Sequence, residues 1–188
     1  MADADAGKRQ VLFIQGGGDN GYEVDAKLVA SLKQKLGAAY TVLYPIMGVD
    51  NDAPDFGWGR QIKRGIAATQ GDAILVGHSV GASILLKYLT ENTVQHSISG
   101  IFLIAPPFWG YEKWQMESLT LRDDFAARLP KGVPIFIYQA KDDEEVSIAH
   151  LAKYAEKLPQ ATIREIASGG HQLGNDLTPV AEDIQKLK

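Results

Sequence analysis

The feature that most constrains the fold of this sequence is a series of short, continuously apolar runs separated by amphipathic stretches. The apolar residues are consecutive rather than alternating, which is typical of strands buried on both faces of a parallel sheet. We expect six strands, at Gln10–Gln15, Tyr40–Tyr44, Ala73–Gly77, Gly100–Ala105, Val133–Gln139 and Ala161–Ile166. Runs of this length are too short to cross a bilayer as helices.

The stretches between these runs have apolar residues at helical spacing. In the first of them, Val24, Leu28, Leu32 and Leu36 fall on one face. We expect helices at Glu23–Leu36, Gln61–Thr69, Gly81–Glu91, Asp123–Leu129, Ile148–Leu158 and Leu177–Leu187. The alternation of strands and helices predicts an α/β fold, namely a three-layer α/β/α sandwich on a mainly parallel six-stranded sheet with right-handed crossovers.

The length of 188 residues suits one domain, and no repeat, low-complexity tract or long linker divides the chain. We therefore expect a single domain over residues 1–188, with residues 1–9 flexible. The segment before Gln10 is polar and has no apolar core, so it does not read as a secretory signal. A cytoplasmic protein is the simplest interpretation.

Composition excludes several classes of function. The chain has no cysteine, which rules out a disulfide framework, a thiolate zinc site and a cysteine nucleophile. Its formal net charge is −4, and no large block of like charge favours a nucleic acid or a membrane surface as a partner. The partner that we expect is a small molecule, and the oligomeric state is left undetermined.

The strongest functional motif is Gly77-His78-Ser79-Val80-Gly81, which follows one expected strand and precedes an expected helix. A G-x-S-x-G motif in this context is typical of a nucleophile elbow. A serine at the apex of so sharp a turn has strained backbone geometry, and glycines two positions before and after it relieve the crowding. The turn exposes the serine hydroxyl beside the first N–H groups of the helix. The alternative is a glycine-rich turn in which Ser79 only caps the helix.

A serine nucleophile needs a base within hydrogen-bond reach, and the chain has four histidines. His78 lies inside the elbow on the wrong side of the turn, His96 precedes a strand in a polar stretch, and His150 falls on an expected helix. His171 follows the last expected strand, at the carboxyl end of the sheet, and we assign it as the base. The alternative is an ordinary surface-loop histidine.

The acid that orients this base should follow the strand Val133–Gln139, where the chain has successive carboxylates from Asp142 to Glu145. Such a run usually lies in a solvated loop and helix N-terminus, and we expect this of most of its members. We assign Asp143 as the acid because Val146 stands three positions later, ahead of an amphipathic helix. Asp142 is the alternative.

The oxyanion of an acyl-transfer reaction needs two N–H donors. We expect one from Val80, the residue after the nucleophile, and one from Gly17 in the loop Gln15–Gly18 after the first strand. The order 2-1-3-4-5-6 for the strands makes the first and third strands neighbours, so this loop faces the nucleophile across a crevice. A phosphate site is a weaker interpretation, since the spacing is not G-x-G-x-x-G and no P-loop lysine follows.

The least regular stretch is Pro106–Thr120, which is rich in aromatic residues. A long loop in a compact domain is often functional or mobile. We expect Phe108, Trp109 and Trp114 to wall an apolar acyl pocket there. The alternative is that these side chains only cover the core beside the loop.

Together these motifs resemble the α/β-hydrolase superfamily, especially its small, lid-poor serine hydrolases of the retinoblastoma-binding-protein-9-like and small bacterial esterase types. The resemblance extends from Val11 to the final helix and rests on Gln15–Gly17, the elbow, Asp143 and Gly169–His171. It implies a reduced, six-stranded α/β-hydrolase fold with the chain order serine, aspartate, histidine. Larger members carry histidine where Gln15 stands, so the oxyanion loop departs from their pattern.

The motifs and the resemblance predict a serine hydrolase that cleaves a carboxylic ester, or a related acyl bond. Ser79, His171 and Asp143 would form its triad, and the reaction would pass through an acyl-enzyme. This chemistry requires neither a cofactor nor a metal. Two alternatives stay open: a binding or interaction protein of this fold with weak or no catalysis, and an acyltransferase. The acyl group is not identified by the sequence.

Overall fold

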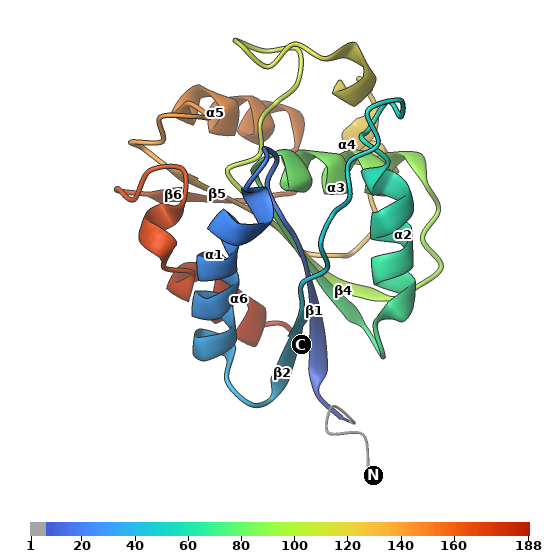
Figure 1. Cartoon of the computed structure of the whole chain (residues 1–188), viewed down its shortest axis with the longest axis vertical. Coiled ribbons are helices and arrows are strands. Elements are labelled where there is room, and N and C mark those ends of the chain that lie inside the picture. The colour runs from blue at the N-terminus through green and yellow to red at the C-terminus, as the bar shows by residue number, and fades with distance from the viewer. Residues whose placement is uncertain (1–6) are drawn as a thin grey trace.

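The computed structural model describes residues 7–188, and its centre is a six-stranded sheet of order β2-β1-β3-β4-β5-β6 (Figure 1). Every neighbouring pair is parallel. The strands are β1 (Arg9–Ile14), β2 (Tyr40–Leu43), β3 (Ala73–His78), β4 (Ile98–Ile104), β5 (Ile135–Ala140) and β6 (Thr162–Ile166). The expected strands and their order are confirmed, with ends displaced by at most two residues. Of the segment expected to be flexible, residues 1–6 lie outside the described residues, whereas Arg9 already belongs to β1.

Helices cover both faces of the sheet and complete the three expected layers (Figure 1). One face packs against α1 and α6, and the other against α2, α3, α4 and α5. The helices are α1 (Gly21–Leu36), α2 (Trp58–Ala68), α3 (Ser79–Glu91), α4 (Phe125–Arg128), α5 (Ile148–Lys157) and α6 (Thr178–Gln185). In the described part of the chain, no helix is both long enough and apolar enough to cross a membrane.

The buried face of α1 includes Leu28, Leu32 and Leu36, as expected, but it differs from the expected face at Val24. Val24 is 44% exposed, whereas Asp25, one position later, is 1% exposed and lies on the same face as Leu28 and Leu32. The spacing of 25, 28 and 32 is as good a helical stripe as the one that starts at Val24. Hydrophobicity alone favours the valine for the buried position. The structure instead buries the carboxylate, because hydrogen-bonding partners lie beneath the helix.

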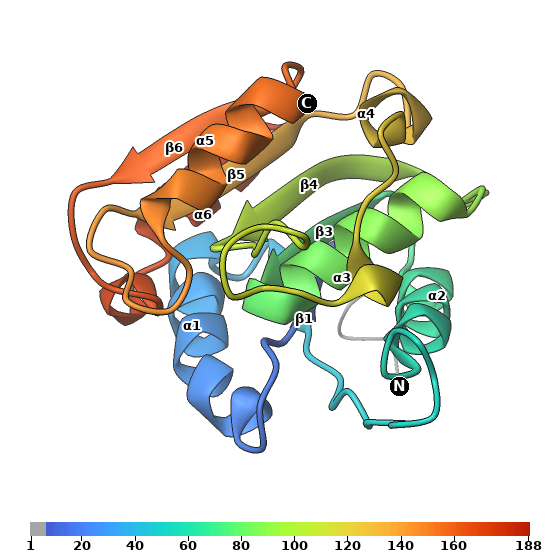
Figure 2. The same cartoon turned by 90° about the horizontal axis from the view of Figure 1, so that it is seen from above.

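The sheet order reverses between β1 and β3, which lie side by side in the middle of the sheet. In open α/β sheets, the crevice at the carboxyl ends of the strands at such a reversal is the usual place for a ligand. Figure 2 looks down on the molecule from above, with the loop after β4 passing over α3. The loops that follow β1, β3, β5 and β6 bring the residues of the candidate active site together at this edge.

Candidate active site

Ser79 occupies a tight turn between β3 and α3, and its backbone is strained. Its φ of 51° lies in the left-handed region, which a residue with a side chain rarely adopts. A Cβ at Gly77 would lie 2.7 Å from the Cα of Ala82, and one at Gly81 would lie 1.9 Å from the carbonyl oxygen of Gln15. Both positions therefore require glycine for steric reasons, as the elbow motif predicts.

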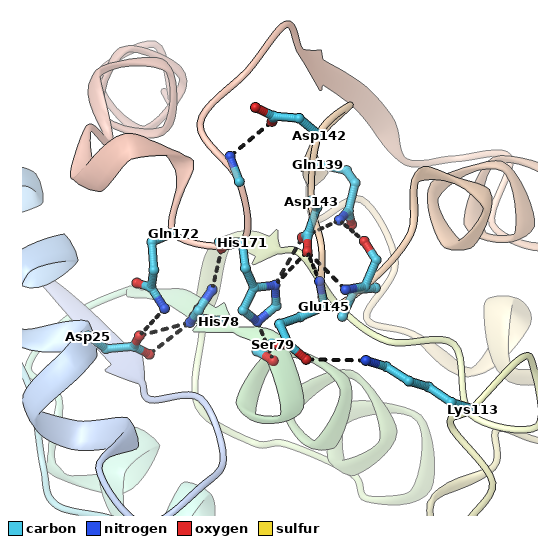
Figure 3. Close-up of polar contacts among 12 residues, drawn as sticks. Asp25, His78, Ser79, Lys113, Gln139, Asp142, Asp143, Glu145, His171 and Gln172 are labelled. Atoms are coloured by element: carbon cyan, nitrogen blue, oxygen red, sulfur yellow. Dashed lines mark hydrogen bonds and ion pairs between the residues drawn. The ribbon is translucent and has the colours of Figure 1, made fainter.

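A continuous chain of hydrogen-bonding groups joins Ser79, His171 and Asp143 (Figure 3). His171 Nε2 lies 2.9 Å from Ser79 Oγ, and His171 Nδ1 lies 2.9 Å from Asp143 Oδ2. The three residues come from the loops or turns that follow β3, β6 and β5. The His171 side chain is 12% exposed and that of Asp143 is fully buried, so the base can reach a substrate while its partner is shielded from water.

Asp143 is held from several directions besides His171. Its Oδ1 accepts hydrogen bonds from the backbone N–H groups of Glu145 and Val146, each at 2.9 Å, and Gln139 Nε2 donates to its Oδ2 at 2.6 Å. Burial by itself would raise the pKa of Asp143, but the hydrogen bonds from His171 and these N–H groups hold it below its usual value. The carboxylate is therefore ionised at neutral pH, as an acid that orients a base must be.

Asp142, the alternative acid, has a different role. It is exposed, and its two oxygens accept hydrogen bonds from the backbone N–H groups of Gly170 (2.9 Å) and Gly169 (3.2 Å). These hydrogen bonds lower the pKa of Asp142. The Asp142 side chain thus stabilises the turn that precedes His171, whereas Asp143 contacts the imidazole itself. Gln139, which donates a hydrogen bond to Asp143, was not predicted as a site residue, because a glutamine at the end of a strand has no distinguishing sequence signal.

The loop after β1 lies against the first turn of α3. A Cβ at Gly17 would meet the side chain of Val80 at 3.1 Å, so the two expected oxyanion donors are neighbours in space. The Gly16 N–H is occupied, since it donates to Asp25 Oδ2 at 2.7 Å. Gln15 Oε1 accepts from the N–H of Met47 at 3.0 Å and so ties the loop to the chain after β2. Among the described residues, none accepts a hydrogen bond from the Gly17 N–H.

A second histidine–aspartate pair lies beneath this loop. His78 Nδ1 is 2.9 Å from each oxygen of Asp25, and His78 Nε2 is 3.0 Å from the backbone carbonyl oxygen of His171. Both side chains are almost completely buried. The place of His78 inside the elbow was a reason to set it aside as the base, but nothing in the sequence identified a partner for it. A carboxylate on the apolar stripe of α1 was the available signal.

The other two histidines lie outside this arrangement. His150 is fully buried, accepts a hydrogen bond from the Phe108 N–H at 2.8 Å and faces Glu112 at 3.3 Å. Burial lowers the pKa of His150. His96 contacts the Thr69 hydroxyl at 2.8 Å, near the opposite end of the sheet.

An apolar cavity of about 470 Å³ opens beside Gly17 and Val80. Its apolar wall consists of Ile46, Met47, Val49, Phe56, Trp58 and Trp109. Asp19 and Glu23 contribute carboxylates to its lining, and both are exposed. Most of this wall belongs to the segment between β2 and α2, in which no sequence motif indicated a site residue.

Of the three aromatic residues expected to form a pocket, Trp109 lines this cavity. Phe108 and Trp114 are not part of its wall. Phe108 packs edge-on against Phe125 and Tyr154, and Trp114 packs edge-on against Trp109 with ring centroids 5.2 Å apart. These two side chains cover the core under the loop, which is the alternative that the sequence left open for them.

Within residues 7–188, no three or more histidine, aspartate or glutamate side chains are grouped in a way that could hold a metal ion. No glycine-rich phosphate loop of the G-x-G-x-x-G kind follows β1 either. The polar groups that converge at the site are a hydroxyl, two imidazoles, carboxylates, side-chain amides and backbone N–H groups.

A parallel sheet with a strained serine elbow, contacted by a histidine that an aspartate orients, defines the class of α/β-hydrolase-fold serine hydrolases. The sequence profile of the family described as serine hydrolase matches residues 30–176 of this chain. The chain belongs to this serine hydrolase family, and the retinoblastoma-binding-protein-9-like subtype suggested by its motifs fits that membership.

Solved structures with the same fold include several hydrolases. The ydeN gene product of B. subtilis is 18% identical, with a TM-score of 0.68, over 95% of this chain and 97% of that one. Est1E from Butyrivibrio proteoclasticus is 15% identical, with a TM-score of 0.69, over 95% of this chain and 87% of its own. A predicted CIB-like hydrolase from Thermoplasma acidophilum is 16% identical, with a TM-score of 0.68, over 97% and 89% of the two chains. At these identities the likeness establishes the fold alone. No curated protein sequence matches this chain at a significant level.

Proposed function

We propose that this protein is a carboxylesterase-like serine hydrolase that cleaves a carboxylic ester by way of an acyl-enzyme. The observation that carries this proposal is the continuous contact from Asp143 through His171 to Ser79, with 2.9 Å at each step. Such a hydrogen-bonded series of acid, base and hydroxyl is suited to a nucleophile that must lose its proton as it attacks. Membership of the serine hydrolase family supports the same reaction class.

In this mechanism, His171 Nε2 takes the hydroxyl proton of Ser79 while Oγ forms a bond to the ester carbonyl carbon. The N–H groups of Val80 and Gly17 hold the resulting oxyanion, and each such donor is typically worth ~3–4 kcal/mol in the transition state. His171 then returns the proton to the leaving alkoxide, which departs as an alcohol. Water, deprotonated by the same imidazole, releases the acid and restores Ser79.

Asp143 stays ionised throughout and holds His171 in the tautomer that carries its proton on Nδ1. The lowered pKa of Asp143 supports this role, because a carboxyl group that protonated easily would release the imidazole. Its hydrogen bonds to Glu145 and Val146 fix the carboxylate before the substrate arrives. Preorganisation of this kind reduces the rearrangement that the transition state requires.

The cavity beside Gly17 and Val80 would take an apolar, uncharged part of the ester. Its volume of about 470 Å³ exceeds what an acetyl group needs, and its wall is largely aliphatic and aromatic. The carboxylates of Asp19 and Glu23 disfavour a negatively charged group there. We therefore expect esters of neutral acyl chains somewhat longer than acetyl, such as butyryl, to be hydrolysed faster than acetate esters.

The test is burst hydrolysis of p-nitrophenyl acetate and butyrate by the wild type, Ser79→Ala and His171→Ala. Turnover should fall ~10³-fold or more in both variants, with folding intact by circular dichroism. Equal and feeble rates in all three proteins, with no labelling of the wild type by a fluorophosphonate probe, would support a binding protein instead. Faster transfer of the acyl group to added alcohols than to water would indicate an acyltransferase.

A further inference from the structure

The buried pair of His78 and Asp25 takes no part in the steps proposed above, yet it touches the site on two sides. His78 directly precedes the nucleophile in the chain. Its side chain is 1% exposed and that of Asp25 is 2% exposed. Burying a carboxylate and an imidazole is costly unless both are paired, and apolar side chains of the same volume would often stabilise a fold as well. The location of the pair therefore calls for an explanation beyond packing.

The partners of His78 determine where its protons lie. Nδ1 faces the carboxylate of Asp25 at 2.9 Å, and Nε2 faces the carbonyl oxygen of His171 at 3.0 Å. A carbonyl oxygen can only accept a hydrogen bond, and a carboxylate is likewise an acceptor. Both contacts are hydrogen bonds only if both ring nitrogens carry a proton, which makes the ring an imidazolium paired with a carboxylate.

Asp25 extends the same arrangement to the oxyanion loop. Its Oδ2 accepts the Gly16 N–H at 2.7 Å, and its Oδ1 accepts a weaker hydrogen bond from Gln172 Nε2 at 3.3 Å. Gly16 is the neighbour of Gly17, the expected oxyanion donor, and Gln172 is the neighbour of His171. One carboxylate on α1 thus contacts the residues beside both groups that must be held in register with the nucleophile. Figure 3 shows its contacts with His78 and Gln172.

We propose that His78 and Asp25 are positioning residues: the His78 imidazolium fixes the backbone of His171, and Asp25 fixes the loop that carries the Gly17 N–H. The pair does not touch the reacting atoms, and acts through the placement of the base and of one oxyanion donor. The inference rests on the proposed function, since the position of His171 matters only if His171 is the base. An error of about 1 Å in such placement can reduce turnover ~100-fold.

The substitutions that test the inference separate the two contacts. His78→Asn keeps a donor near the position of Nδ1, facing Asp25, but cannot reach the carbonyl of His171. Asp25→Asn keeps the size of the side chain and removes its charge. The matched control is Asp183→Asn, which changes another buried carboxylate that is held by Tyr138 at 2.9 Å and by Arg164, away from the site. Ser79→Ala is measured in parallel with p-nitrophenyl butyrate.

We expect His78→Asn and Asp25→Asn to lower kcat ~10–100-fold with KM changed less than threefold, because alignment is lost rather than substrate binding. Asp183→Asn should keep the kcat of the wild type per folded molecule. If both site variants behave like Asp183→Asn while Ser79→Ala abolishes turnover, the positioning role is wrong and the proposed function stands. If Ser79→Ala retains turnover, the proposed function itself fails.

A spectroscopic measurement on the wild type covers the case in which the variants do not fold. Nitrogen-15 NMR at pH 7 of protein labelled on its histidine rings should detect a proton on both ring nitrogens of His78. His78 is assigned as the ring that reports close contacts with the His171 ring, whose centroid is 4.8 Å away. A proton on only one ring nitrogen of His78 would leave either the Asp25 carboxylate or the His171 carbonyl without a hydrogen bond from the ring, and would overturn the inference.

Discussion

The two histidine–aspartate pairs at this site are built from the same groups but differ in their third partner. In each, Nδ1 lies 2.9 Å from a buried carboxylate. Beyond the ring, His171 meets the hydroxyl of Ser79, whereas His78 meets a backbone carbonyl. A hydroxyl can give up a proton and a carbonyl oxygen cannot, so the first pair is suited to proton transfer and the second to holding a backbone in place. The chemistry of a histidine therefore depends on the group opposite its carboxylate.

The largest expected effect separates the two neighbouring carboxylates of the first pair. Asp143→Asn should lower kcat ~10³–10⁴-fold on p-nitrophenyl butyrate, because the amide no longer holds His171 in the required tautomer. Asp142→Asn should cost less than tenfold, since it weakens hydrogen bonds to the turn of Gly169 and Gly170 without touching the imidazole. Steady-state kinetics of both variants make the comparison, and equal losses would contradict the assignment of the acid.

A smaller effect is expected from the loop that the second pair steadies. Gly17→Ala places a methyl group 3.1 Å from a methyl of Val80, and the loop must move by a few tenths of an ångström. We expect kcat to fall ~10-fold with the melting temperature nearly unchanged, because a misplaced donor weakens oxyanion binding. Gly48→Ala is the control, since its Cβ would meet Gln61 at an ordinary 3.7 Å. A kcat that does not change in Gly17→Ala would exclude its N–H as a donor.

The cavity should give a still smaller, substrate-dependent effect. Val49 lines the cavity and is 61% exposed. Val49→Asp removes an apolar contact with the acyl chain that would be worth about 1 kcal/mol of binding free energy, and puts a charge in its place. We expect kcat/KM for the butyrate ester to fall ~5–10-fold and that for the acetate ester to change little. Val24→Asp, at an exposed valine that does not line the cavity, is the matched control. Equal losses for both esters would place the acyl chain elsewhere.

The smallest expected effect concerns stability in acid. The folded-state pKa of Asp143 is lowered, so its contribution to the free energy of unfolding is present above the usual carboxyl pKa of about 4 and is lost as the pH falls through the folded value. Asp143→Asn should therefore lose less stability than the wild type between pH 5 and pH 3. Urea unfolding at several pH values measures this difference. Parallel acid profiles would mean that Asp143 is not held as an ionised group.

Much of this protein is determined by local sequence. Continuous apolar runs specified the six strands, and the spacing of glycines around Ser79 specified the elbow, because burial and steric crowding act on neighbours in the chain. His171 was identified by its position after the last strand, and the structure places it against Ser79. Only the spacing to Val146 favoured Asp143 over Asp142 as the acid, so the sequence left a choice between two carboxylates.

The tertiary structure alone decided which groups meet across long separations. The contact between Asp25 and His78 joins residues 53 positions apart, and that between Asp25 and Gln172 joins residues 147 apart. No periodicity encodes such partners, and hydrophobicity alone therefore favours Val24 over Asp25 for the buried face of α1. The cavity wall at Ile46 and Val49 was missed for the same reason. Two exposed apolar residues indicate a binding cavity only when the fold places them beside Gly17 and Val80.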